Sequence, residues 1–167
     1  HDPLASAITI STRQDTLDAI QTALNIQITE CQRQSVLLKS IANRSLILTK
    51  TKHDALCLIN EIASEHLVLL VDNPKDLLSD IRHAGAIFMG PYTPVTLGDY
   101  VAGPTTVLPT SKAARYASPL TVMDFMKATS LVTYSQHALQ EVSQTLKTLT
   151  DAEGFDAHYL AVAKRLE

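Results

Sequence analysis

The chain has 167 residues, of which 46% are hydrophobic and 19% are charged, a composition that suits one compact domain with a small appendage. Its formal net charge of −3 argues against nucleic acid as a partner. No apolar run is long enough to cross a bilayer, so we expect no membrane partner. Cys31 and Cys57 have no CxxC spacing, and we expect both to be buried free thiols of a cytoplasmic protein.

The first two-thirds of the chain alternates short apolar runs with segments whose apolar residues recur at helical spacing. We predict strands over residues 6–12, 45–49, 67–71 and 86–89. We predict helices over residues 12–23, through the thirties, over 53–63 and over 74–83, with Thr12 as the first N-cap. This rhythm predicts the α/β class, with an incomplete Rossmann-like parallel sheet flanked by helices.

The last third of the chain has a different character. From about Val122 we expect mostly helix, ending in segments 136–150 and 158–167, with Gly154 as the break between them. Two helices with a continuous apolar stripe must dock on the sheet domain or on another subunit. We therefore predict two domains: an α/β domain over residues 1–119 and a helical tail or dimerisation domain over residues 120–167.

Residues 83–127 hold four of the five glycines and most of the prolines, so their backbone follows a specific irregular path. Within this stretch Asp99 lies on a predicted loop, where functional residues are common. Ligands of parallel sheets bind beyond the carboxyl ends of the strands, a rule that we expect to point to two regions, the first of which is the loop after Phe88. A second candidate region is Ser64–Glu65–His66, at the start of a predicted strand.

No glycine-rich phosphate motif, GxSxG elbow or HExxH motif occurs, which leaves a dispersed set of histidines and carboxylates. His66 suits a general base near neutral pH, and the adjacent Glu65 could activate a water molecule. The alternative is a surface Glu beside a half-buried His. Asp99 could bind a metal or cap a turn, and His158 lies near Glu153 across Gly154. These alternatives stay open on the residues alone.

The whole chain resembles the C-terminal part of histidinol dehydrogenase. The resemblance rests on short motifs whose order and spacing match, namely Glu65-His66-Leu67, His83-Ala84-Gly85-Ala86-Ile87-Phe88, Gly90-Pro91-Tyr92, Gly98-Asp99-Tyr100, Ala102-Gly103-Pro104, Val107-Leu108-Pro109-Thr110, Asp124-Phe125-x-Lys127 and Ala157-His158. Each fragment alone is weak, but together they are specific.

The resemblance implies oxidation of L-histidinol to L-histidine through an aldehyde, with zinc and two NAD in succession. Glu65 resembles the family's water-activating acid and His66 its general base. Asp99 and His158 resemble zinc ligands, and His1 falls where the family has a third ligand. Glu153 falls at a substrate-contacting Glu. The resemblance also implies a homodimer in which the tail is lent to the partner, so that His66, Asp99 and a second copy's His158 meet in one cleft.

Two departures from the family's pattern are visible. Thr106 stands where the family has a substrate-contacting His. Threonine keeps a hydroxyl but lacks the ring nitrogen that accepts a hydrogen bond. A zinc-binding Gln and the NAD-binding region lie upstream of His1 in the family and are absent from this sequence. We therefore expect either part of a longer enzyme or a truncated relative. The alternative functions are a non-catalytic dimeric binding or scaffolding module, and an enzyme for another amino-alcohol.

Overall fold

The computed structural model describes residues 2–167, which include mixed helices and short parallel strand pairs, as the α/β prediction requires. The chain folds into two compact units, the first ending at Asp124 and the second running from Phe125 to Glu167. A functional division between residues 119 and 120 stays a prediction.

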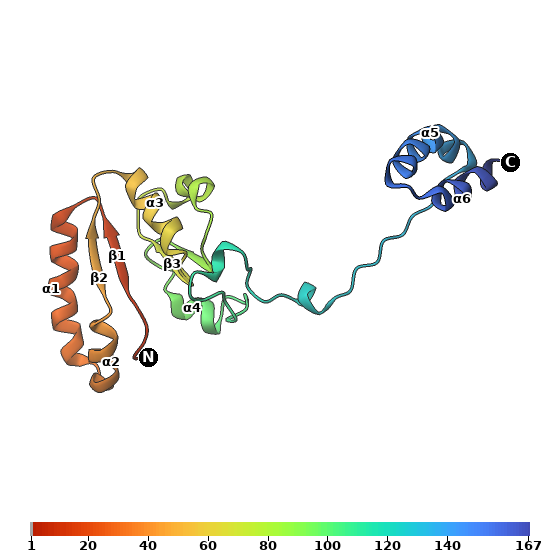
Figure 1. The fold of residues 1–167 in the computed structure, drawn as a ribbon. Helices are drawn as coiled ribbons and strands as arrows, with labels where there is room; N and C mark the ends of the chain where they lie inside the picture. Colours follow the sequence, from red (N-terminus) through yellow and green to blue (C-terminus); the bar gives the residue numbers. More distant parts are fainter. Residues whose placement is uncertain (1) are drawn as a thin grey trace. The chain divides into compact units, whose positions relative to one another are not determined.

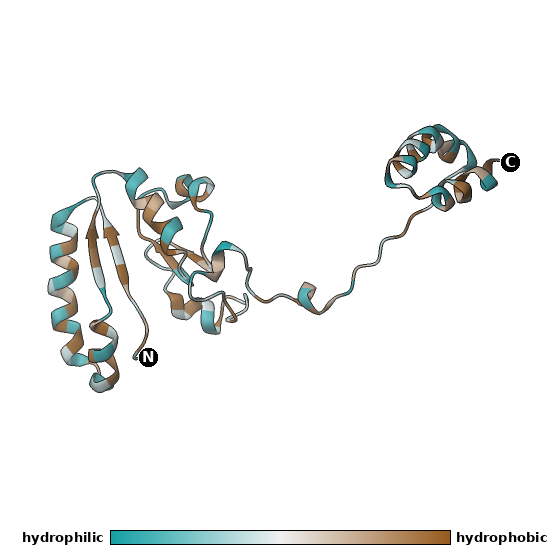
Figure 2. Ribbon diagram, in the orientation of Figure 1, coloured by the Kyte–Doolittle hydropathy of each residue, from teal (hydrophilic) through white to brown (hydrophobic). Residues whose placement is uncertain are grey.

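All four predicted strands form, although each is only four residues long. In the first unit, β1 (Ile8–Ser11) pairs in parallel with β2 (Ser45–Leu48). Farther along the chain, β3 (His66–Leu69) pairs in parallel with β4 (Ala86–Met89). Within residues 2–167 these are two separate two-stranded sheets, whereas the sequence led us to expect one continuous parallel sheet. The hydropathy colouring in Figure 2 shows that the strands are predominantly apolar.

Two helices follow and accompany the first strand pair. Helix α1 (Gln14–Glu30) lies along β1 and β2, and α2 (Gln34–Ile41) leads into β2 (Figure 1). The predicted end of α1 near residue 23 was wrong, because half-buried Leu24 and Ile28 continue its apolar stripe by another two turns. The Thr12 cap was also wrong: Arg13 occupies the N-cap position and makes no side-chain capping hydrogen bond.

Helix α3 (Lys52–Ile62) begins with a capping box. The Thr51 hydroxyl accepts a hydrogen bond from the Asp54 backbone N–H at 3.1 Å, and the Asp54 carboxylate accepts one from the Thr51 N–H at 3.0 Å. The helix ends at Ala63, which is buried and left-handed with φ of 49°. This turn redirects the chain into Ser64 and Glu65, so the end of α3 determines where β3 starts.

Short elements and loops make up the rest of the first unit. Residues Pro74–Asp80 form a 3-10 helix, η1, rather than the α-helix predicted over 74–83. Helix α4 (Val95–Tyr100) follows β4, and single 3-10 turns occur at η2 (Ala113–Arg115) and η3 (Val122–Phe125). Residues 126–135 have no regular structure, which corrects the expectation of continuous helix from Val122.

The second unit contains a helix pair, α5 (Gln136–Glu153) and α6 (Asp156–Leu166), which lie side by side in Figure 1. Gly154 ends α5 with φ of 73°, a conformation that glycine adopts without steric cost. The predicted apolar stripe of α5 is half-buried at Leu139, Val142 and Leu146, whereas Leu149 remains 56% exposed.

Few side chains are fully buried among residues 2–167. The buried hydrophobic residues are Leu17, Ala63, Leu69 and Phe88, and the buried polar residue is Thr49. Cys31 and Cys57 are free thiols but are exposed, so the expected burial was wrong. In this part of the chain no helix has both the length and the apolar character needed to span a bilayer.

We expect Thr51→Ala to lower the free energy of unfolding by about 1 kcal/mol, because the capping box loses the acceptor for the Asp54 N–H. Thr51→Ser is the matched control, since serine retains the hydroxyl. Urea denaturation followed by circular dichroism measures both. Equal midpoints for the Ala and Ser variants would contradict a capping role for this hydroxyl.

Candidate functional site

The structure places Glu65 and His66 together at the start of β3. The His66 Nδ1 and Glu65 Oε1 atoms lie 4.0 Å apart, and the side chains are 30% and 40% exposed, respectively. This distance is too long for a hydrogen bond, so the interaction is electrostatic. Both side chains are partly exposed and can reach a ligand, and histidine is the usual base near neutral pH. The pair is therefore suited to general-base chemistry.

Gly85 determines how closely the backbone of β4 approaches this pair. Its N–H donates to the Ser64 carbonyl at 2.9 Å, and the Ala86 N–H donates to the Glu65 carbonyl at 2.8 Å. A Cβ at position 85 would lie 2.6 Å from the Glu65 carbonyl oxygen and 3.2 Å from Cδ of Pro109. The close approach that we expected of glycine in this stretch occurs here, and it fixes the backbone of Glu65.

Phe88 connects His66 with the helix that carries Asp99. The His66 and Phe88 rings have centroids 5.9 Å apart and are tilted by 41°. The ring of Phe88 also lies against Gly98, where an added Cβ would lie 2.6 Å from Cε1 of Phe88. Asp99 is the next residue and is exposed. The structure thus brings α4 and His66 onto a common aromatic side chain.

The strand register separates the two regions selected from the sequence. His66 pairs with Ala86 and Leu69 with Met89, so Glu65 and His66 lie at the amino ends of β3 and β4. The loop after β4 leaves from the carboxyl ends. The carboxyl-end rule therefore does not account for the position of Glu65 and His66, although α4 returns to contact Phe88.

Thr106 belongs to a loop that also approaches Gly85. The Thr106 side chain is exposed, whereas Pro109, three residues later, is buried against Gly85. The Leu120 N–H donates to the Val107 carbonyl at 3.0 Å, which closes this loop. The neighbourhood of Glu65 therefore includes the base of the loop that carries Thr106.

An arginine clamp, formed by Arg115 on Glu61, ties the same loop to the end of α3. The guanidinium of Arg115 donates to the Glu61 carbonyl at 2.6 Å and lies 2.9 Å from the Glu61 carboxylate, with Lys112 at 3.7 Å. These cations lower the pKa of Glu61, chiefly through the Arg115 hydrogen bond. Sequence reasoning did not identify the clamp, because the two residues are 54 positions apart.

Glu153 and His158 belong to the second unit. Glu153 is the last residue of α5 and is exposed. His158, in the first turn of α6, is exposed and stacks on Phe155 with a centroid separation of 5.3 Å. Over residues 2–167, neither the His158 ring nor the Asp99 carboxylate makes a hydrogen bond or ion pair with another side chain.

Among residues 2–167 no group of three or more His, Cys, Asp or Glu side chains could hold a metal ion. His1, the other candidate ligand, lies outside the described residues. The ligand set expected from the sequence combines Asp99 and His1 with His158 of a second copy. The absence of a cluster among the described residues of one copy therefore does not contradict this set.

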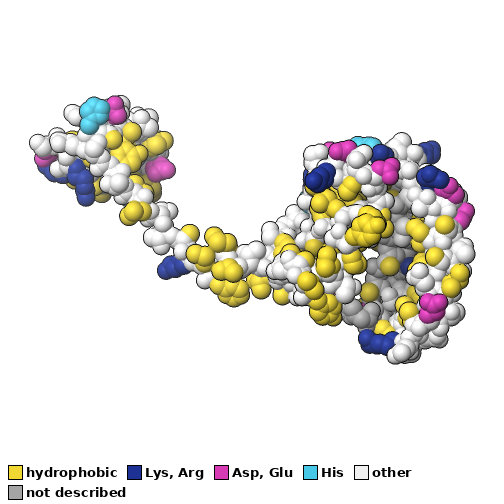
Figure 3. All heavy atoms as spheres, turned by 180° about the vertical axis from the view of Figure 1, so that it is seen from behind, with side chains coloured by type: hydrophobic (Ala, Val, Ile, Leu, Met, Phe, Trp, Pro, Cys, Tyr) yellow, Lys and Arg dark blue, Asp and Glu magenta, His cyan; other side chains and the backbone are white. Residues whose placement is uncertain are grey.

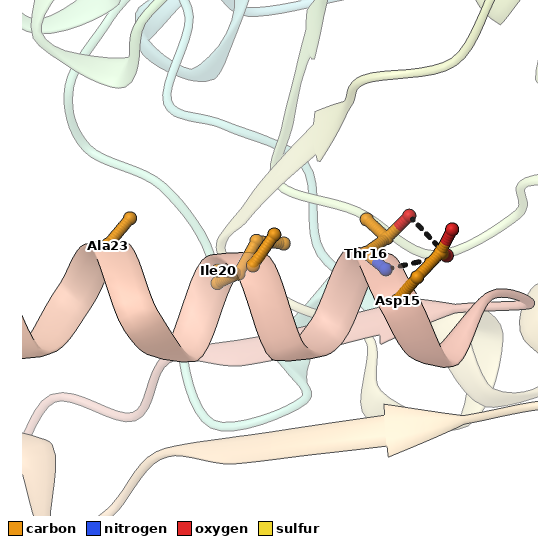
Figure 4. A pocket seen from close by; sticks show the side chains of 5 residues that line it. Asp15, Thr16, Ile20 and Ala23 are labelled. Atoms are coloured by element: carbon orange, nitrogen blue, oxygen red, sulfur yellow. Dashed lines mark hydrogen bonds between the residues drawn. The ribbon is translucent and has the colours of Figure 1, made fainter.

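Two surface hollows lie away from these residues. One runs along α1 and is lined by Asp15, Thr16, Ala19, Ile20 and Ala23, and the labelled side chains project from the same side of the helix in Figure 4. Another lies beside α3, and its lining includes Cys57, Asn60 and Arg115. Neither includes a residue that we selected as a candidate for catalysis, metal binding or substrate binding.

Comparison with known proteins identifies one family throughout. The family model described as histidinol dehydrogenase matches residues 1–166. A histidinol dehydrogenase of Neisseria gonorrhoeae is 43% identical over 168 residues, covering 100% of this chain and 39% of the relative. One of Wolinella succinogenes is 41% identical, with 99% and 39% coverage. This chain thus spans about two-fifths of the length of these relatives.

A solved structure of the same family has a similar fold. The crystal structure of histidinol dehydrogenase from Elizabethkingia anophelis matches with a TM-score of 0.96 and 25% sequence identity. The match covers 99% of this chain and 38% of that structure's chain.

We expect the arginine clamp to make stability depend on pH. Because the folded pKa of Glu61 is below its ordinary value of 4.5, the clamp stabilises the fold above about that pH and is lost as the pH falls through the folded pKa. Glu61→Gln should therefore flatten the pH dependence of the urea midpoint in the acid range. Glu30→Gln is the matched control, and an unchanged acid slope in Glu61→Gln would contradict the prediction.

Proposed function

Because this chain belongs to the histidinol dehydrogenase family, we propose that it forms the base- and metal-binding part of an NAD-linked enzyme that oxidises L-histidinol to L-histidine. The observation that carries the proposal is the Glu65–His66 pair at the start of β3, in a chain that matches the family from end to end. The activity is that of a longer protein, and we assign its NAD-binding surface to a part outside this sequence.

His66 and Glu65 meet two different chemical demands. In the alcohol step the hydroxyl proton passes to a ring nitrogen of His66 as the carbon loses hydride. In the aldehyde step a water molecule must be added before the second hydride leaves, and Glu65 is the base that accepts its proton. When bound, NAD supplies the hydride acceptor for both steps, and zinc supplies a Lewis acid that orients the substrate's polar groups.

The donor atoms present fit zinc by their chemistry. Asp99 offers carboxylate oxygens and His158 offers ring nitrogens, both common zinc ligands, and neither is committed to another side chain over residues 2–167. We propose these two residues with His1 as ligands, with His158 contributed by a second copy of the chain. Such a homodimer would exchange the helical tail at residues 120–167.

Substrate recognition is assigned to Glu153 and Thr106. An exposed carboxylate at the end of α5 can bind an ammonium or imidazolium group of an amino-alcohol. Thr106 offers a hydroxyl on the loop that Pro109 anchors beside Gly85. The free thiols suit a reducing compartment, and we propose a cytoplasmic enzyme.

Two alternatives follow from Thr106. The chain could belong to a relative that oxidises another amino-alcohol, or to a non-catalytic dimeric binding or scaffolding module. A panel of amino-alcohols with NAD, tested on the chain fused behind the N-terminal part of a family member, separates them. If histidinol is the one compound of the panel that is oxidised, an enzyme for another amino-alcohol is excluded. If any compound is oxidised, a non-catalytic module is excluded.

We expect His66→Gln in this fusion to lower kcat for histidinol oxidation by about 10²–10⁴-fold, the usual contribution of a general base. Glu65→Gln should affect oxidation of the aldehyde more than that of the alcohol, because only the aldehyde step consumes water. Stopped-flow measurement of NADH formation from each substrate distinguishes the two steps. Asp72→Asn, at an exposed carboxylate after β3, is the control. Equal losses in both steps for both variants would refute the division of roles.

We expect Thr106→His to lower KM for histidinol in the same fusion, since an imidazole restores the ring acceptor that the family has at this position. Thr105→His, at the neighbouring residue, is the control for an added imidazole. Initial-rate kinetics give both constants. A KM that stays unchanged, or rises, would mean that position 106 does not contact the substrate.

A further inference from the structure

The ring of Phe88 is enclosed from two directions. It is only 7% exposed, one of the few buried side chains among residues 2–167. The parallel register pairs His66 with Ala86 and Val68 with Phe88, so His66 and Phe88 project from the same face of the β3–β4 pair. Their ring centroids are 5.9 Å apart at 41°, within the range of favourable aromatic contacts.

A second contact to the ring is made by the backbone of α4. A Cβ on Gly98 would lie 2.6 Å from Cε1 and 2.8 Å from Cζ of Phe88, both below real contact distances. Gly98 does not have a positive φ, so space for the Phe88 ring, and not backbone conformation, requires a glycine there. The ring tip therefore lies directly against the residue that precedes Asp99.

We propose that Phe88 is a positioning residue that sets the distance between the His66 imidazole and the α4 segment carrying Asp99. This inference rests on the proposed function, in which His66 is the base and Asp99 a metal ligand. The ring limits the imidazole to one orientation and prevents α4 from moving toward β3. A displacement of about 1 Å in such a site costs on the order of 10²-fold in rate, so the spacing matters although Phe88 touches neither substrate nor cofactor.

The geometry suggests variants that act from each side. Phe88→Leu keeps an apolar side chain but removes the ring beside His66. Phe88→Tyr keeps the ring but adds a hydroxyl at Cζ, which points at Gly98. Gly98→Ala leaves Phe88 intact and pushes on it through α4. Tyr116→Leu removes the ring of a tyrosine that is 85% exposed and is the matched control.

The first measurement needs no zinc, NAD or turnover. Histidine-ring NMR signals of the full 167-residue chain are recorded, and that of His66 is identified by its loss in His66→Gln. We expect the His66 ring signals to shift in Phe88→Leu and in Gly98→Ala, and to remain unchanged in Tyr116→Leu. Circular dichroism verifies that each variant is folded. Should Phe88→Leu fail to fold, the same His66 signals are compared in Phe88→Tyr and Gly98→Ala. Unshifted signals in both folded variants would then overturn the positioning role.

The second measurement is the split between kcat and KM in the fused full-length protein. We expect Phe88→Leu to lower kcat by about ten- to 10²-fold with little change in KM, and Tyr116→Leu to change neither constant. Unshifted His66 signals in folded Phe88→Leu would overturn the positioning role, as would a shifted signal accompanied by a wild-type kcat. Absence of turnover in the wild-type fusion, with shifted His66 signals, would overturn the proposed function and support the Phe88 contact itself.

Discussion

The close approach of two backbones at Gly85 is the constraint on which the candidate site depends. No side chain fits between position 85 and the Glu65 carbonyl, and the paired hydrogen bonds from Gly85 and Ala86 set the register of β3 against β4. That register places the His66 ring beside Phe88, and Phe88 in turn contacts α4. The same glycine contacts Pro109, so one backbone position orders the base, the Asp99 helix and the Thr106 loop.

The sequence predicted the local elements well where local pattern determines them. All four strands were found, because short apolar, β-branched runs bounded by polar residues have few other solutions. The Glu65–His66 pair was selected from its position before a predicted strand and from the chemistry of its side chains, and the family resemblance then suggested a role for each. What could not be predicted involves contacts distant in sequence: the separation into two strand pairs, the Arg115 clamp on Glu61, and the role of Phe88 between residues 66 and 98.

The described residues leave much apolar surface exposed. Leu131 is 95% exposed, Phe125 79% and Val122 77%, and Figure 3 shows hydrophobic side chains gathered along the segment before α5. Exposed apolar surface on this scale is unfavourable in water and is usually covered by a partner. This agrees with a chain that spans two-fifths of its relatives, and it supports the proposal that further protein surface, from the same enzyme or a second copy, packs here.

The candidate base residues and the candidate metal ligands differ in how strongly the fold restricts their positions. Glu65 and His66 are positioned by a strand, a glycine contact and a buried ring, all within the first unit. Asp99 and His158 are exposed side chains on a short helix and on the tail, with no side-chain partners over residues 2–167. A metal ion can bring such donors together only when the assembly is complete, because binding free energy then contributes to folding and association. On the proposed function, metal affinity should therefore report assembly of the enzyme, whereas the orientation of His66 depends on contacts with β4 and α4 within the first unit.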